Sequence, residues 1–570
     1  MLSLVLSLSK FKFNPLTFVF EKSPPHHRLF LLKSLKLEES NYAKNLIKWI
    51  TKIQNFDGSF PWDFFPGEES DPWMAIDTLD LLPDKQYFEV VRKTLNFLEN
   101  SLEKLDFYSV LLLTFVLKRS GKVNTKIYQK SLKILEMRLK ERSKQKKKLK
   151  IFAKILLNNI LGDEKFERPF ANEVLAEKDP WTLGYWLLTL KNDIAPSLKQ
   201  KIEDFALKTE KKGGGWRGRF FGFSGTYGDP LTTSIFLQGL IESKILDLNE
   251  LSSEVKRRLE LFSKIGDTLR RKERKIENFF LARIEDAGYV PDMDVKEKLL
   301  LCFIYSLISQ FYWAISGLEP WEETLNFIGK QEGLVSFEKY TNFNDVYNAF
   351  KDILRGSVPS NRIEMTARAV TLYSIFLNSR DFESFQEYAE NLRHFVIDEV
   401  SRYAPSYGGA RNVGWVVRSV AFNRKELHNL VGDVYKCLMS FPSIGFKTAC
   451  LQMFLSGRIM NTWNKEIRRY IYPLIDVFSV STLSRLNLLS LPHVAEKEPR
   501  KAFRCLFWLG AAIKPNDPSL ATGLWLIGRE WCLRQQCNKY SDYLGEKGCW
   551  FRNFCPSVKG VERKDVKRKG

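Results

Sequence analysis

Helical periodicity is the feature that most constrains the fold of this chain. Apolar residues recur at steps of three and four along most of the sequence, and the alternating patterns typical of strands are few. We therefore expect a mainly α protein. The pattern is clearest in the first half, where it predicts helices over these ranges: 39–55, 86–104, 106–119, 125–160, 181–191, 196–210, 231–243 and 250–278.

The charge of the chain favours a polyanionic partner. Lysine and arginine together number 88 against 67 acidic residues, which gives a formal net charge of +21. Such an excess is typical of proteins that bind nucleic acid or an anionic membrane surface. No uncharged apolar run reaches the length of about 18 residues that a membrane-spanning helix needs. We expect no membrane span, and a cytoplasmic protein associated with the nucleoid.

Two similar turns separate helices of the first half, QNFDGSF at 54–60 and GGGW at 213–216. They resemble the glycine-aromatic turns of the α/α-toroid family that includes squalene and hopene cyclases and prenyltransferase β subunits. The resemblance implies a helical-repeat, toroid-like domain over 1–255, in which stacked helix pairs bury their faces against their neighbours. The sequence leaves the partner of this domain open. The residues that carry the likeness are Gln54, Asp57, Gly58, Phe60, Gly214, Gly215 and Trp216.

The segment FPSIGFKTAC at 441–450 indicates a tight turn between two helices. Gly445 permits a backbone conformation that most residues avoid, and the amides at the start of the next helix are ready donors to an anion. The segment resembles the helix-hairpin-helix motif of DNA glycosylases such as endonuclease III, with Ser443 in place of the motif's first glycine. The resemblance implies that Lys447 is a nucleophile. It also implies that the hairpin holds a DNA backbone through Ile444, Gly445 and Thr448.

An aspartate follows the lysine in the same family, and Asp476 matches it here, 29 residues beyond Lys447. Phe478 stands where the family has a histidine. The pairing makes chemical sense, because removing a base leaves positive charge on the sugar that a carboxylate stabilises. A neutral amine can attack the same carbon and form a Schiff base.

A helix predicted over 296–315 contains Leu307, Ile308, Ser309 and Gln310 in succession. This order resembles the Leu-Ser-x-Gln of the glycosylases. The resemblance implies that Gln310 fills the gap left when the target base leaves the duplex, a step required because the glycosidic bond is inaccessible inside the base stack.

Half of the cysteines crowd into a short segment near the C-terminus. Cys532, Cys537, Cys549 and Cys555 have the spacing Cys-x4-Cys-x11-Cys-x5-Cys. In a chain without a secretion signal, such clustering points to metal or cluster ligation rather than to disulfides. The segment resembles the four-cysteine loop of the glycosylases, in which the last interval agrees and the first two differ, and this implies a [4Fe-4S] cluster. Zinc is the alternative ligand.

Together these patterns predict two domains, a toroid-like domain over 1–255 and a helix-hairpin-helix glycosylase-like domain over 256–570 with its cluster loop at 532–555. The hypothesis is a repair enzyme that removes a damaged base from double-stranded DNA and can then act as an abasic-site lyase. Two alternatives stay open. One is a non-catalytic iron-sulfur DNA-binding protein, and the other is a terpenoid cyclase-like enzyme.

Overall fold

The computed structural model is built almost entirely of helices. Among the described residues the only strands are β1 (Tyr540–Ser541) and β2 (Glu546–Lys547), which pair antiparallel. The mainly α prediction is confirmed. No described helix combines the length and the apolar character needed to cross a bilayer. The model describes residues 6–558 except 146–147, 163–168, 191–193, 220–227, 316–319, 331–336, 355–357, 408, 423, 461–462, 464–465, 490–499 and 533–535.

The chain divides into two compact units. The first comprises Met1–Lys264 with the short segment Leu486–Val494, and the second comprises Ile265–Arg485 with Ala495–Gly570. The division falls inside helix α13 (Leu248–Arg271), close to the boundary predicted after residue 255.

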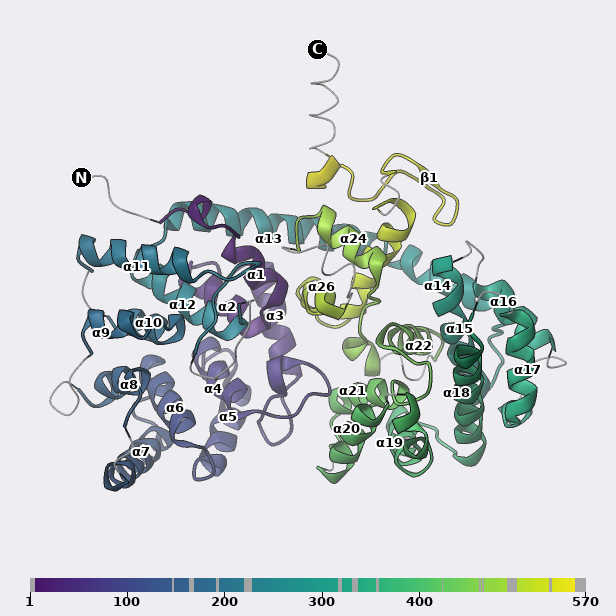
Figure 1. The fold of residues 1–570 in the computed structure, drawn as a ribbon, viewed down its shortest axis with the longest axis horizontal. Helices are drawn as coiled ribbons and strands as arrows, with labels where there is room; N and C mark the ends of the chain where they lie inside the picture. Colours follow the sequence, from purple (N-terminus) through teal and green to yellow (C-terminus); the bar gives the residue numbers. More distant parts are fainter. Residues whose placement is uncertain are drawn as a thin grey trace, which may run out of the picture. The chain divides into compact units, whose positions relative to one another are not determined.

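Helices of the first unit form a closed circuit. Among the described residues, α2, α4, α6, α8, α10 and α12 contact one another in that order, and α12 contacts α2 again (Figure 1). Further helices pack on this inner set, with α3 on α2, α5 on α4, α7 on α6 and α9 on α10. The helices up to the boundary are α1 (Pro15–Lys22), α2 (Pro25–Ser34), α3 (Asn41–Lys52), α4 (Pro72–Leu81), α5 (Phe88–Ser101), α6 (Phe107–Arg119), α7 (Lys126–Lys144), α8 (Ile151–Leu161), α9 (Ala171–Ala176), α10 (Pro180–Leu188), α11 (Pro196–Thr209) and α12 (Pro230–Glu242).

Three helices of the circuit begin with the same pair of residues, aspartate followed by proline. Asp71, Asp179 and Asp229 are the N-caps of α4, α10 and α12, and each carboxylate accepts a backbone N–H of the first turn. Proline suits the first helical position because its fixed φ is already helical and its missing N–H would have no helical partner. This repeated start fixes the first residue of three helices of the circuit.

The two turns singled out in the sequence each contact a helix of the first unit. Gly58 has a φ of +93° and lies so close to α5 that a Cβ would meet the carbonyl oxygen of Lys93, which leaves room only for glycine. Gln54 donates to the carbonyl of the same glycine and to that of Val90 in α5. The indole of Trp216 is fully buried and donates to the carbonyl of Ala206 in α11.

The second unit is assembled around α22, most of whose residues are buried and which packs on α14, α15 and α21 (Figure 1). The hairpin predicted from the sequence leads into this helix. The described helices of the second unit are α14 (Glu273–Asp286), α15 (Val295–Ile315), α16 (Pro320–Lys330), α17 (Phe343–Ile353), α18 (Ser360–Ser379), α19 (Phe385–Asp398), α20 (Ala410–Ala421), α21 (Leu427–Leu438), α22 (Phe446–Ile459), α24 (Val477–Arg485), α26 (Arg500–Ile513) and α27 (Thr522–Ile527).

Candidate functional site

The hairpin between α21 and α22 has its unusual backbone conformation at Ser443, not at Gly445. Ser443 has a φ of +61°, whereas Gly445 has a φ of −90°. The expectation that Gly445 supplies the rare conformation is therefore wrong. A left-handed φ costs a residue with a side chain roughly 1–2 kcal/mol. Two hydrogen bonds hold Ser443 in place, because the Gln310 amide and the Thr366 hydroxyl both donate to its Oγ, at 3.3 and 3.2 Å.

Gly445 instead leaves free space at the start of α22. It is the N-cap of α22 and gives that helix no side-chain cap, and a Cβ added there would meet nothing within 4 Å. A helix N-terminus attracts anions through its amides and its dipole, and the absence of a side chain lets a ligand's backbone come close. Ile444 and Thr448, the other two hairpin candidates, are both buried.

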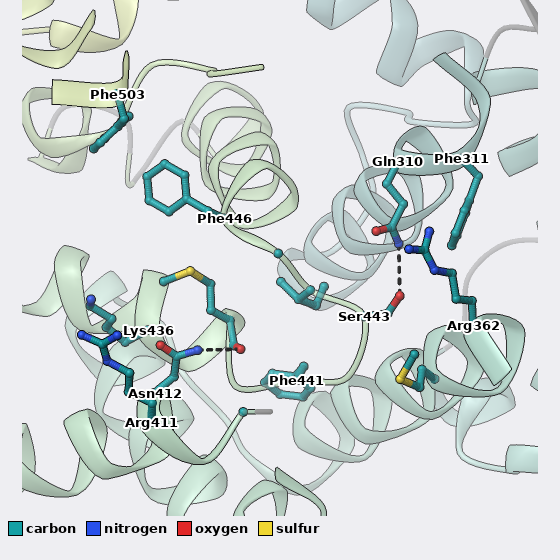
Figure 2. A pocket seen from close by; sticks show the side chains of 15 residues that line it. Gln310, Phe311, Arg362, Arg411, Asn412, Lys436, Phe441, Ser443, Phe446 and Phe503 are labelled. Carbon is teal, nitrogen blue, oxygen red and sulfur yellow. Dashed lines mark hydrogen bonds between the residues drawn. The ribbon is translucent and has the colours of Figure 1, made fainter. Parts of the chain in front are cut away.

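A cavity of about 720 Å³ lies beside the hairpin, within the second unit. Its lining contains three cationic side chains, Arg362, Arg411 and Lys436, and no carboxylate (Figure 2). Within the described part of the chain, neither of the two arginines forms an ion pair. The cavity therefore has a net positive wall suited to an anionic ligand. The other lining residues are Gln310, Phe311, Met365, Gly409, Asn412, Met439, Phe441, Ser443, Ile444, Gly445, Phe446 and Phe503.

Gln310 lies at this cavity, so the glutamine and the hairpin candidates meet although they are far apart in the sequence. Figure 2 shows its amide directed toward Ser443 from the helix that faces the hairpin loop. On the other side of the loop, Phe446 packs edge-to-face on Phe503 with ring centroids 4.6 Å apart. The cavity thus combines cations, an amide and aromatic faces.

Lys447 and Asp476 lie side by side. Lys447 is the second residue of α22, and its Nζ is 3.1 Å from Oδ2 of Asp476. The lysine side chain is 33% exposed and the aspartate 9%. The pair is therefore reachable from solvent on the lysine side, while the carboxylate is held within the protein.

Asp476 is fixed by two further donors. The buried indole of Trp525 in α27 donates to Oδ2 at 2.8 Å, and the backbone N–H of Phe478 donates to Oδ1 at 2.8 Å. Phe478, which replaces the family's histidine, thus serves the aspartate through its backbone, and its ring packs edge-on against Trp525. A carboxylate with fixed donors is a preorganised negative charge.

The four C-terminal cysteines gather at the other end of α24, whose first residue follows Asp476. Arg485, the last residue of this helix, donates to Sγ of Cys537 at 3.8 Å, and its carbonyl accepts from the Cys555 thiol at 3.7 Å. The N–H of Cys549 donates to the Cys537 carbonyl at 2.8 Å. Cys532, Cys549 and Cys555 are buried and Cys537 is partly exposed.

The thiols influence one another's ionisation. A hydrogen bond with Cys549 lowers the pKa of Cys532, and the same bond raises the pKa of Cys549. Burial raises the pKa values of Cys537 and Cys555. All four cysteines therefore belong to one electrostatic group beside the Arg485 guanidinium.

The spacing of the four sulfur atoms bears on whether they could hold a single zinc ion. Four thiolates at about 2.3 Å from one zinc would stand about 3.8 Å apart. Among the described residues, no three of these sulfur atoms all lie within 4.8 Å of one another. Thiolates at the corners of an iron-sulfur cage lie further apart than the ligands of one ion, and a nearby cation such as Arg485 balances their charge.

Exposed basic side chains surround the cysteine loop. Lys539, Lys547 and Arg552 are exposed, whereas Glu546 of β2 is tied to Lys272 and Lys275. The loop therefore presents a positive surface to solvent, as a phosphate-binding loop requires.

Sequence reasoning missed the three cations of the cavity. Arg362 begins a stretch that reads as an ordinary amphipathic helix, and Arg411 and Lys436 belong to two other helices. No spacing links them, because only the packing of α18, α20 and α21 brings them to one cavity. Comparison of the chain with protein-family models, with curated proteins and with solved structures finds no match.

Proposed function

We propose that the second unit is a DNA glycosylase and abasic-site lyase that excises a damaged base from double-stranded DNA. The observation that carries the proposal is the contact of 3.1 Å between the Lys447 amine and the Asp476 carboxylate at the start of α22. An amine nucleophile and a stabilising carboxylate are the two groups that this chemistry needs. The hairpin, the cationic cavity and the cysteine loop support the same function.

The proposed reaction begins with a nucleotide extruded from the duplex, whose sugar carbon is attacked by the Lys447 amine after the amine has given up its proton. The bond from this carbon to the base breaks, and the base leaves with its bonding electrons and takes up a proton. Asp476 stabilises the positive charge that develops on the sugar. The sugar ring opens to a Schiff base with Lys447, and loss of a sugar proton together with the neighbouring phosphate then cuts the strand.

The cavity beside the hairpin provides the binding part of the proposal. The uncapped start of α22 would hold a phosphate at Gly445, and Arg362 and Arg411 would neutralise others. Gln310 would occupy the space of the extruded nucleotide, since its amide lies at the same cavity. Phe446 would offer a face for base stacking, which is worth about 1–3 kcal/mol per base.

Cys532, Cys537, Cys549 and Cys555 would hold a [4Fe-4S] cluster in this proposal. The cluster would fold the loop into a rigid unit and leave the reaction to the two side chains of the active site. Lys539, Lys547 and Arg552 would then meet the phosphate backbone. For the first unit we propose a toroid-like helical-repeat scaffold, which the closed circuit of helices supports.

Borohydride trapping tests the function directly. Purified protein is mixed with duplex DNA that contains one abasic site, borohydride is added, and the covalent adduct is measured by gel shift. Wild-type protein is expected to give an adduct, because borohydride reduces a Schiff base to a stable amine. Lys447→Gln is expected to give none.

Lys436→Gln is the matched control, because it removes a cation of the cavity beside the hairpin without changing the proposed nucleophile. It is expected to bind DNA more weakly and to form the adduct at saturating DNA. Equal trapping by wild type and Lys447→Gln would exclude the lysine as nucleophile. DNA binding without trapping in the wild type would identify a non-catalytic iron-sulfur DNA-binding protein instead.

A further inference from the structure

Two adjacent histidines at the start of α2, in the first unit, have an unusual arrangement. His26 and His27 are 1% and 4% exposed, and their ring centroids are 3.9 Å apart. Successive residues of a helix point about 100° apart, so neighbouring rings do not normally meet. Within the described part of the chain, both ring nitrogens of His27 and Nδ1 of His26 have no hydrogen-bond partner. Buried nitrogens without a partner call for an explanation.

A carboxylate from the next helix of the circuit reaches the same place. Oδ2 of Asp77 in α4 is 3.4 Å from Nε2 of His26. One ligand atom from each of His26, His27 and Asp77 lies within 4.8 Å of the other two. The Asp77 side chain is 22% exposed, so the group is open to solvent on one side.

No lysine or arginine forms an ion pair with Asp77 within the described residues. Lys33 and Arg119 pair with Asp80, and the buried Arg28 donates to the Tyr42 hydroxyl and to a backbone carbonyl. Burial raises the pKa of Asp77, and the negative charges of Asp80 and Asp71 raise it further. The local field therefore favours a cation.

We propose that His26, His27 and Asp77 bind a divalent transition-metal ion, Zn²⁺ by default, and leave one coordination position open. Ligands at about 2.1 Å from a tetrahedral zinc stand about 3.4 Å apart, which matches the 3.4 Å between Nε2 of His26 and Oδ2 of Asp77. Two imidazoles with one carboxylate and an open position form a ligand set used by zinc and by non-haem iron. The ion would tie α2 to α4, two consecutive helices of the circuit.

The two imidazoles are ready for metal binding. Burial disfavours the charged form of both rings and lowers the pKa of each. A neutral ring offers the lone pair that a metal requires. Coordination would also give one of the two unpartnered His27 nitrogens a partner.

A second acidic group in the chain shows the opposite situation. Glu273, Glu277 and Asp517 also come together, but Arg468 contacts all three and Lys514 contacts two of them. These cations already occupy the place of a metal ion. The three carboxylates are thus neutralised by basic side chains of the protein itself. Asp77 of the histidine group has no such lysine or arginine partner among the described residues.

The test measures metal binding by the full chain. The protein is treated with chelator, dialysed and titrated with Zn²⁺ or Co²⁺ alone, and bound metal and iron are counted by mass spectrometry in the same samples. Wild type is expected to bind one equivalent more than His27→Phe and Asp77→Asn, with unchanged iron. Co²⁺ is expected to give a visible ligand-field band in the wild type that is missing from His27→Phe and Asp77→Asn. His394→Gln and Asp84→Asn, at an exposed histidine and an exposed aspartate, are the matched controls and should bind as the wild type does.

Equal metal binding by the wild type and by Asp77→Asn would overturn the proposal. Preferential uptake of Fe²⁺ would support the site and identify iron as its ion. Because His27→Phe replaces a buried residue, Asp77→Asn provides the independent variant, and the melting temperature provides the independent measurement. Saturating Zn²⁺ should raise the melting temperature of the wild type and leave that of Asp77→Asn unchanged, because only a native-state ligand stabilises the fold. An equal rise in both would refute the site.

Discussion

The cationic wall of the cavity gives the sharpest prediction about DNA binding. Replacing Arg362 and Arg411 by glutamine removes two positive charges that have no ion-pair partner in the described structure. Each phosphate that a cation neutralises contributes about 0.9 to the slope of log affinity against log salt concentration. The double variant should therefore lose about 1.8 from that slope. Between 100 and 300 mM salt, the wild type should lose about sevenfold more affinity than the double variant.

Fluorescence anisotropy with a duplex that carries a stable abasic-site analogue measures both slopes. Arg402→Gln is the matched control, because Arg402 is an exposed arginine of the same unit that is already paired with Glu399. Its slope should equal that of the wild type. A double variant with the wild-type slope would show that DNA does not contact this cavity, and the binding part of the proposed function would fail.

Three further predictions concern the site and its surroundings. Lys447→Gln should cost at most about 1 kcal/mol of unfolding free energy in urea, because a partly exposed ion pair contributes little. Asp476→Asn should cost about 1.5–3 kcal/mol, because it disturbs buried hydrogen bonds to a charged group. Equal costs for the two variants would contradict the asymmetry of the pair. Trp525→Phe removes the indole donor and should slow adduct formation about tenfold or more at unchanged DNA affinity, and an unchanged rate would show that the indole does not position Asp476. Burial lowers the pKa of His428 to about 3, below the unfolded value of about 6.5. Between these two pKa values the unfolded state binds more protons than the folded state, so stability falls as the pH falls. His428→Gln should therefore flatten the pH dependence of the unfolding free energy by about 1.4 kcal/mol per pH unit, and an unchanged slope would refute the assignment.

Helix positions in the first half follow from the sequence because each helix carries its own apolar stripe. The predicted helices at 106–119 and 196–210 correspond closely to α6 and α11. The single helix predicted over 125–160 is wrong, since α7 ends at Lys144 and α8 begins at Ile151. The lysine-rich run between them would place like charges on neighbouring helical turns, which disfavours a continuous helix.

Contacts between distant segments could be predicted only where a family resemblance supplied the order. The resemblance paired Lys447 with Asp476, and the two side chains lie 3.1 Å apart. The same reasoning assigned the rare backbone conformation to the remaining glycine of the motif, because it took glycine as the only residue suited to it. Ser443 adopts that conformation instead, held by hydrogen bonds from Gln310 and Thr366. These two residues belong to other helices, so no local sequence pattern reveals the contacts.

The cysteine loop and Asp476 lie at opposite ends of α24. Whether the reaction depends on the loop can therefore be tested. Asp476 precedes the helix and is held by Trp525 and by the Phe478 amide, and neither donor belongs to the loop. Cys555→Ser should therefore lose iron and expose the loop to hydrogen exchange, while residues around Asp476 keep their protection. Because the loop supplies phosphate contacts in the proposed function, this variant should bind DNA more weakly yet form the borohydride adduct at saturating DNA. Loss of the adduct at saturating DNA, with the helices still protected, would mean that the loop takes part in the reaction itself.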